Sequence, residues 1–116
     1  MSDVTIYHNP RCSKSRQTLA LLEERGIQPN IVLYLENTPN QKQLKSLLSK
    51  LGISARDLMR TGESEYKDNN LKDKDLSEAA LITAMVKYPK LIERPIVVAN
   101  GKAALGRPPE KVLEIL

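Results

Sequence analysis

Two short apolar runs separated by one helical stretch constrain the fold of this chain more than any other feature. Residues 4–8 are rich in β-formers, and Asn9-Pro10 ends that run because proline cannot donate to a strand ladder and disfavours helix in the residue before it. A helical pattern follows and stops at Gly26, and residues 31–35 form a continuous apolar run. This order predicts a parallel βαβ unit whose second strand is buried on both faces.

The central part of the chain, about residues 40–88, is predicted to be a helical insertion. Three stretches with helical spacing or a capping signal mark its helices: the leucines that precede Gly52, residues 54–60, and residues 75–88. The polar residues 61–74 are expected to form mostly loop.

The last part of the chain returns to strand composition. Residues 96–99 and 102–105 flank Asn100-Gly101, the dipeptide most favoured in a type I′ hairpin turn, and Pro108-Pro109 opens a final helix. The order of elements predicts one α/β domain over residues 1–116, with the helical segment inserted into a βαβ…ββα sheet.

Composition narrows the classes of function. The chain has 116 residues and 41% hydrophobic content, which suits one modest core, and its one cysteine cannot form an internal disulfide. No secretory or membrane-spanning run is visible, so a location in the cytoplasm, where thiols stay reduced, is expected. The chain is also expected to be a monomer. The net charge of +4 favours anionic partners, but scattered basic residues and four tyrosines as the only aromatics do not predict binding to nucleic acid or membrane.

The single cysteine, Cys12, lies where the first helix should begin. Free N–H groups and the positive end of the helix dipole stabilise an anion there, and Arg16 adds a positive charge one turn later, so a reactive thiolate is favoured. Ser15 stands where a two-cysteine redox protein would carry its second thiol, and its hydroxyl can hydrogen-bond the sulfur. The alternative to a reactive thiolate is that Cys12 only packs as a small apolar side chain at the helix start.

Four further residues are candidates for the same site. His8, the only histidine, ends the first strand, where an ordinary role at a strand end is equally open. One cysteine and one histidine do not make a metal site. Three arginines lie beside a helix end, a proline or a glycine, where a guanidinium fork can bind an oxyanion or can simply be solvated: Arg60, Arg94 and Arg107.

The segment HNPRCSKSR, residues 8–16, is similar to the H-x3-C-x3-R signature of the glutaredoxin-coupled arsenate reductase family, ArsC, and within it to the YfgD-type branch. Residues 93–97 (ERPIV) and 105–109 (LGRPP) extend the resemblance along the whole chain. It implies a thioredoxin-like fold of the glutaredoxin type with an inserted helical subdomain, and a cis peptide before Pro95 next to the thiol.

The resemblance also implies roles for the candidate residues. Cys12 would attack As(V) as the nucleophile, glutathione would serve as co-substrate, and the partner glutaredoxin would clear the mixed disulfide, without a bound cofactor or metal. The other roles implied are tuning of the thiol pKa by His8, Ser15 and Arg16, and binding of the oxyanion by Arg60, Arg94 and Arg107.

Alternatives to arsenate reduction remain at this point. Ser13-Lys14 follows the cysteine where arsenate reductases usually carry Gly-Thr, so a thiol reductase acting on another oxyanion or electrophile is possible. The fold also resembles that of Spx, a redox regulator that binds RNA polymerase. Spx-type proteins carry a Cys-x-x-Cys switch at this helix start, whereas Ser15 occupies the second position here. A monothiol glutathione-handling protein is the third class.

Overall fold

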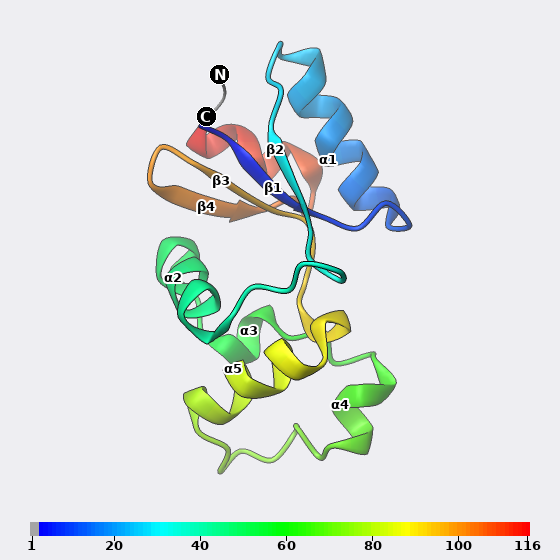
Figure 1. Cartoon of the computed structure of the whole chain (residues 1–116), viewed down its shortest axis with the longest axis vertical. Coiled ribbons are helices and arrows are strands. Elements are labelled where there is room, and N and C mark those ends of the chain that lie inside the picture. Colours follow the sequence, from blue (N-terminus) through cyan, green and yellow to red (C-terminus); the bar gives the residue numbers. More distant parts are fainter. Residues whose placement is uncertain (1–2) are drawn as a thin grey trace. The chain divides into compact units, whose positions relative to one another are not determined.

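The computed structural model describes residues 3–116, which divide into two compact units (Figure 1). The sheet unit comprises the residues up to Asn37 together with Arg94–Leu116. The helical unit, Thr38–Glu93, contains helices and one isolated β-bridge between Met59 and Ile92. The helical character predicted for residues 40–88 is confirmed.

The sheet has four strands in the order β2-β1-β3-β4. Strand β1 (Thr5–His8) pairs in parallel with β2 (Asn30–Leu33), and helix α1 (Ser13–Glu24) connects them. On its other side, β1 pairs antiparallel with β3 (Ile96–Ala99), which pairs antiparallel with β4 (Lys102–Leu105). This is the predicted βαβ…ββα arrangement of a thioredoxin-like fold.

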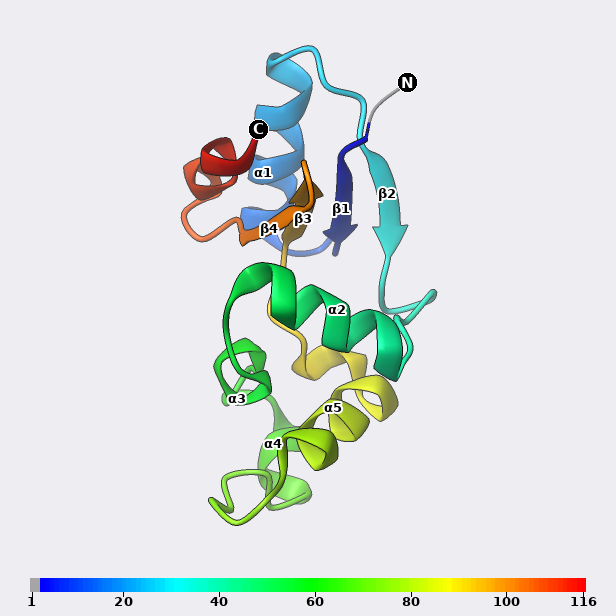
Figure 2. The same ribbon diagram turned by 90° about the vertical axis from the view of Figure 1, so that its left-hand side faces the viewer.

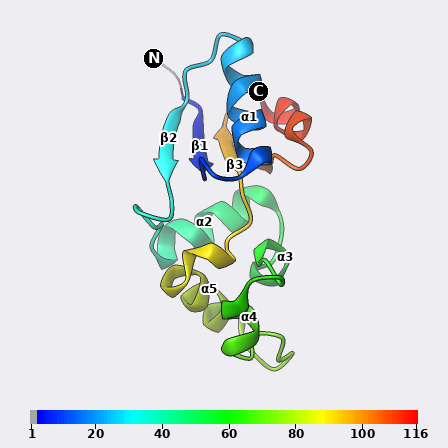
Figure 3. The ribbon, with the colours of Figure 1, turned by 90° about the vertical axis from the view of Figure 1, so that its right-hand side faces the viewer.

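The core of the sheet unit forms where two helices cover one face of the sheet. Helix α1 and the C-terminal 3-10 helix η2 (Pro109–Ile115) lie on the same side of the strands (Figures 2 and 3). Four fully buried side chains make the centre of this core: Ile6, Leu22, Val97 and Val112. The final helix predicted after Pro108 is therefore present, but its turns are those of a 3-10 helix rather than an α-helix.

The hairpin between β3 and β4 has the predicted turn. Both central residues have positive φ, 55° at Asn100 and 74° at Gly101. A type I′ turn requires this conformation at both positions, and asparagine and glycine are the residues that adopt it at least cost.

The prediction that the second strand is buried on both faces is wrong. In the observed order β2 has a strand neighbour on one side only, and its first two residues are exposed. Ile31 is 50% exposed, and Leu35, which follows the strand, is 39% exposed. Burial of both faces requires packing on both sides of the strands, and in the sheet unit α1 and η2 lie on the same side (Figures 2 and 3).

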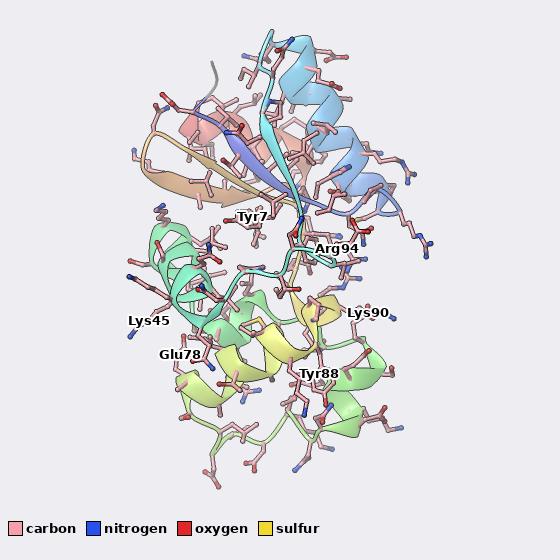
Figure 4. All side chains as sticks on the ribbon, in the orientation of Figure 1. Tyr7, Lys45, Glu78, Tyr88, Lys90 and Arg94 are labelled. Carbon is pink, nitrogen blue, oxygen red and sulfur yellow. The ribbon has the colours of Figure 1, made fainter. Side chains whose placement is uncertain are left out.

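The helical unit contains four α-helices and a 3-10 turn: α2 (Gln41–Leu51), α3 (Ala55–Leu58), α4 (Ser64–Asp68), α5 (Glu78–Lys87) and η1 (Pro89–Leu91). Helix α5 packs against α2, α3 and η1. The apolar face of α2 that the leucine spacing predicts is buried, with Leu44 fully inaccessible. Lys45 of α2 and Glu78 of α5 line a groove between these helices (Figure 4).

Three boundaries differ from those predicted. The residues 61–74 are not all loop, since they contain α4, a helix of five residues with no buried side chain. Helix α3 ends at Leu58 rather than near Arg60. Helix α5 begins later than the cap signal at residue 75 indicates, because Ser77 is the residue whose side chain accepts the N–H of Ala80.

Arg56 holds the irregular segment after α4 to the helix α3. Its Nη1 donates to the carbonyl oxygen of Leu71 at 3.0 Å, and its Nη2 donates to that of Asp73 at 2.8 Å. Carbonyl groups of an irregular segment have no ladder partner, so a charged donor supplies hydrogen bonds that the backbone lacks.

We expect Arg56→Ala to lower the free energy of unfolding by about 2 kcal/mol, because two hydrogen bonds from a charged donor are lost. Arg56→Lys should give a smaller loss, since an ammonium group lacks the planar fork that reaches both carbonyls. Urea unfolding of the three proteins measures these differences. The exposed Arg25 provides the control Arg25→Ala, and an equal loss of stability there would contradict the role given to Arg56.

Candidate active site

Cys12 occupies the N-cap of α1, as its sequence position predicts. Its backbone is extended, with φ −93° and ψ 123°, and its carbonyl oxygen accepts the N–H of Arg16 at 3.0 Å. No side chain caps the helix start. The backbone N–H groups of Ser15 and Lys14 in the first turn nevertheless act on the sulfur of Cys12 and lower the pKa of the thiol.

Asn9 organises the loop that leads to the cysteine. Its side-chain Oδ1 accepts the N–H of Arg11 at 3.0 Å, and its backbone oxygen accepts the N–H of Cys12 at 3.0 Å. Asn9 is buried, with 8% of its surface exposed. The sequence predicts only that Asn9 ends a strand; an asparagine before proline, which favours an Asx turn, is the signal for this further role.

His8 and Ser15 form a buried polar pair between β1 and α1. The Nδ1 of His8 lies 2.7 Å from the Oγ of Ser15, and the same oxygen accepts the N–H of Asn9 at 3.0 Å. Burial and then the positive charge of Arg16 lower the pKa of His8, which favours the neutral imidazole. The hydroxyl of Ser15 is thus placed against His8 and Asn9.

Arg16 holds the first turn of α1 to the loop before it. Its Nη1 donates to the carbonyl oxygen of Pro10 at 2.9 Å, and its side chain is exposed. The positive charge of Arg16 lowers the pKa of His8.

The second part of the site comes from the segments on either side of the β3-β4 hairpin. Figure 4 shows Arg94 on the segment that leads into β3. The Arg94-Pro95 peptide is cis, as the family resemblance predicts, and the Arg107-Pro108 peptide is cis as well. Arg107 donates from Nε to the backbone oxygen of Arg94 at 2.8 Å, and its Nη2 lies 3.5 Å from the sulfur of Cys12.

The surroundings of Cys12 hold its pKa below the ordinary value for a cysteine. Burial, the largest single influence, raises the pKa of the thiol. The hydrogen bond from the Ser15 N–H, the hydrogen bond and charge of Arg94, and the Lys14 N–H together outweigh burial and lower it. A thiolate beside guanidinium groups can act as a nucleophile toward an electrophilic centre that carries negatively charged oxygens.

Arg60 belongs to the helical unit, where two carboxylates contact its side chain. Its Nη1 donates to Glu93 Oε1 at 2.8 Å, and its Nε lies 3.4 Å from Glu63 Oε2. Its backbone N–H donates to the carbonyl oxygen of Leu91. Binding of an oxyanion by Arg60 stays a prediction, as do the roles in chemistry of the other candidate residues.

Within residues 3–116, no three side chains of histidine, cysteine, aspartate and glutamate are grouped as metal ligands. Over the same residues, none of the helices combines the length and the apolar character that crossing a bilayer demands.

The chain has a βαβ…ββα sheet, a thiol at the start of its first helix, and a cis proline directly after Arg94. These features define a thioredoxin-like protein with one activated cysteine. The model of the ArsC family matches residues 7–115, and the chain belongs to this family. The resemblance carried by residues 8–16, 93–97 and 105–109 is therefore confirmed.

Individual relatives cover nearly the whole chain. The protein YfgD of Escherichia coli K12, whose function is uncharacterised, is 64% identical over 114 residues, which are 97% of this chain and 96% of that protein. An arsenate reductase of Haemophilus influenzae is 56% identical over 114 residues, covering 97% and 98% respectively. The solved structure of an arsenate reductase from Vibrio cholerae has a TM-score of 0.96 at 59% identity and covers 97% of each chain.

The electrostatics of Cys12 predict how its alkylation depends on pH. The rate of reaction with iodoacetamide should rise through a midpoint below that of free cysteine, because the thiolate is the reacting form. Arg94→Ala removes a hydrogen bond and a charge from the sulfur and should move the midpoint upward. Arg25→Ala, at the exposed end of α1, is the matched control, and a shift as large as that of Arg94→Ala would refute the assignment.

Asn9→Ala should also raise the midpoint of alkylation, because the loop that places Cys12 loses its side-chain acceptor. The expected cost in folding stability is about 1 kcal/mol, the usual contribution of one hydrogen bond. Asn9→Ser should keep the midpoint near that of the wild type, since a hydroxyl can form a similar turn. An unchanged midpoint in a folded Asn9→Ala protein would show that the turn does not affect the thiol.

Proposed function

We propose that this chain is an arsenate reductase that uses glutathione and glutaredoxin. The observation that carries the proposal is the thiol of Cys12, with a lowered pKa, next to Arg94 and Arg107. Relatives named arsenate reductases, at 56% and 59% identity over nearly the whole chain, support arsenate as the substrate.

In the first step, the sulfur of Cys12 forms a bond to As(V), and one arsenic–oxygen bond breaks. The departing oxygen takes up protons and leaves as water, and arsenic stays in its +5 state. The adduct keeps negatively charged oxygens, which Arg94 and Arg107 can bind through their N–H groups. A thiolate is needed because the neutral thiol is a poor nucleophile.

In the second step, the thiolate of glutathione attacks the sulfur of Cys12. The sulfur–arsenic bond breaks and its electron pair goes to arsenic, so As(V) becomes As(III) while two thiols are oxidised to a mixed disulfide. Glutaredoxin then attacks that disulfide and regenerates Cys12. The second thiol must come from another molecule, since the chain has one cysteine.

This scheme assigns the remaining candidate residues. His8, Ser15 and Arg16 hold the loop and the first turn around Cys12, and Arg60 adds a third guanidinium for the oxyanion. No resident metal or cofactor takes part. A cytoplasmic monomer agrees with the scheme, because glutathione is kept reduced in that compartment.

The test is arsenate-dependent oxidation of NADPH in a mixture of glutathione, glutaredoxin and glutathione reductase. The wild type should turn over, and Cys12→Ser should fall to background because serine is not ionised near neutral pH. Arg107→Ala should raise KM for arsenate roughly tenfold, the effect of one lost hydrogen bond to a charged group. Arg25→Ala should match the wild type.

Three results would contradict the proposal in whole or in part. Turnover by Cys12→Ser would exclude the thiol as the nucleophile. Absence of turnover in the wild type, with a thiol that still titrates below the ordinary range, would mean that the site serves another electrophile. Turnover that persists without glutaredoxin would remove that partner from the scheme and leave the thiol chemistry in place.

A further inference from the structure

Gly106 lies at the point where three segments of the site meet. It is buried, follows β4 directly, and its N–H donates to the carbonyl oxygen of Pro95 at 3.0 Å. Its neighbour in sequence is Arg107, which contacts the sulfur of Cys12. No role in the chemistry follows from its own atoms, since glycine has no side chain.

The space beside Gly106 is too small for a side chain. A Cβ atom built on Gly106 would lie 2.7 Å from Pro95 Cγ, 3.1 Å from Thr18 Cγ2, and closer still to Thr18 Oγ1. Carbon atoms in contact are normally about 3.5 to 4.0 Å apart, so one of these neighbours would have to move.

Neither neighbour can move freely. Thr18 is fully inaccessible in α1, and its hydroxyl donates to the carbonyl oxygen of Lys14 at 2.8 Å. Pro95 is also buried, and its ring is part of the backbone. A side chain at Gly106 would therefore displace the backbone of residues 105–107 away from α1, or displace the Arg94-Pro95 segment, or both.

Either displacement would alter the surroundings of the thiol. Cys12 is the N-cap of helix α1, Pro95 follows Arg94, and Arg107 follows Gly106. The two arginines are also joined, because Nε of Arg107 donates to the carbonyl oxygen of Arg94. The contact at Gly106 thus sets how far both guanidinium groups lie from the sulfur.

We propose that Gly106 is a positioning residue: the absence of a side chain there lets residues 105–107 pack against Thr18 and Pro95, which places Arg94 and Arg107 beside Cys12. The proposal deepens the proposed function and rests on it for the effect on arsenate. Its effect on the thiol is independent of the substrate.

The principal variant is Gly106→Ala, and the first measurement is the pH dependence of iodoacetamide alkylation. The midpoint should move upward and KM for arsenate should rise roughly tenfold, as both arginines lose their positions. Gly62→Ala is the matched control, because a Cβ at Gly62 would meet no atom within 4 Å and its φ is not in the left-handed region. Its alkylation midpoint should equal that of the wild type.

A second variant separates positioning from a general loss of packing. Thr18→Ala with Gly106→Ala removes two of the three close contacts and leaves the one with Pro95. Its midpoint should lie between those of the wild type and Gly106→Ala. If Gly106→Ala alone does not fold, the double variant bears the test, and its midpoint must still exceed that of the wild type.

The outcomes distinguish the two proposals. A folded Gly106→Ala protein, judged by circular dichroism, with the wild-type midpoint overturns the positioning role. A wild type that does not reduce arsenate overturns the proposed function, and the alkylation midpoints still decide the role of Gly106. An upward shift of the alkylation midpoint in Gly62→Ala equal to that in Gly106→Ala would also overturn the positioning role of Gly106.

Discussion

The geometry around the thiol depends on one buried hydroxyl group, that of Ser15. Its Oγ accepts the N–H of Asn9 and lies 2.7 Å from Nδ1 of His8, so hydrogen bonds inside the protein join the first turn of α1 to the end of β1. Buried polar groups need such partners, and loss of the Ser15 hydroxyl would take this partner from both the Asn9 N–H and the His8 imidazole. The backbone N–H of Ser15 also lowers the pKa of Cys12, so the residue that joins helix to strand also favours the thiolate.

Features of the fold that local backbone preferences control were predictable from the sequence. The turn at Asn100-Gly101 requires positive φ at both residues, and that dipeptide is the one that accepts it. The exposure of Ile31 is not predictable from the apolar run, because it depends on which face of the sheet the distant helices cover. Helix α4 was also missed, since it buries no side chain and so leaves no apolar period in the sequence.

Residues of the candidate site also divide into those that their sequence neighbours predict and those that only the fold brings together. Cys12 was identifiable as a helix-start thiol from its immediate neighbours. Arg107 is 95 positions away from it in the chain, and only a fold can bring two such residues to 3.5 Å. The resemblance to the ArsC family predicts that Arg94 and Arg107 lie at the site of Cys12, but it does not indicate the roles of Asn9 and Gly106. Those two residues act through backbone geometry, which residue type and spacing alone do not reveal.

The hydrogen bond from Arg107 Nε to the carbonyl oxygen of Arg94 has a consequence for affinity. A long arginine side chain on the surface normally loses up to about 2 kcal/mol of conformational entropy when a ligand immobilises it. Arg107 is exposed, but this bond already restricts its rotamers, and its Nη2 already lies next to the sulfur. Much of that entropy is therefore lost when the chain folds, so an oxyanion that arrives at the thiol meets a guanidinium group already ordered for binding.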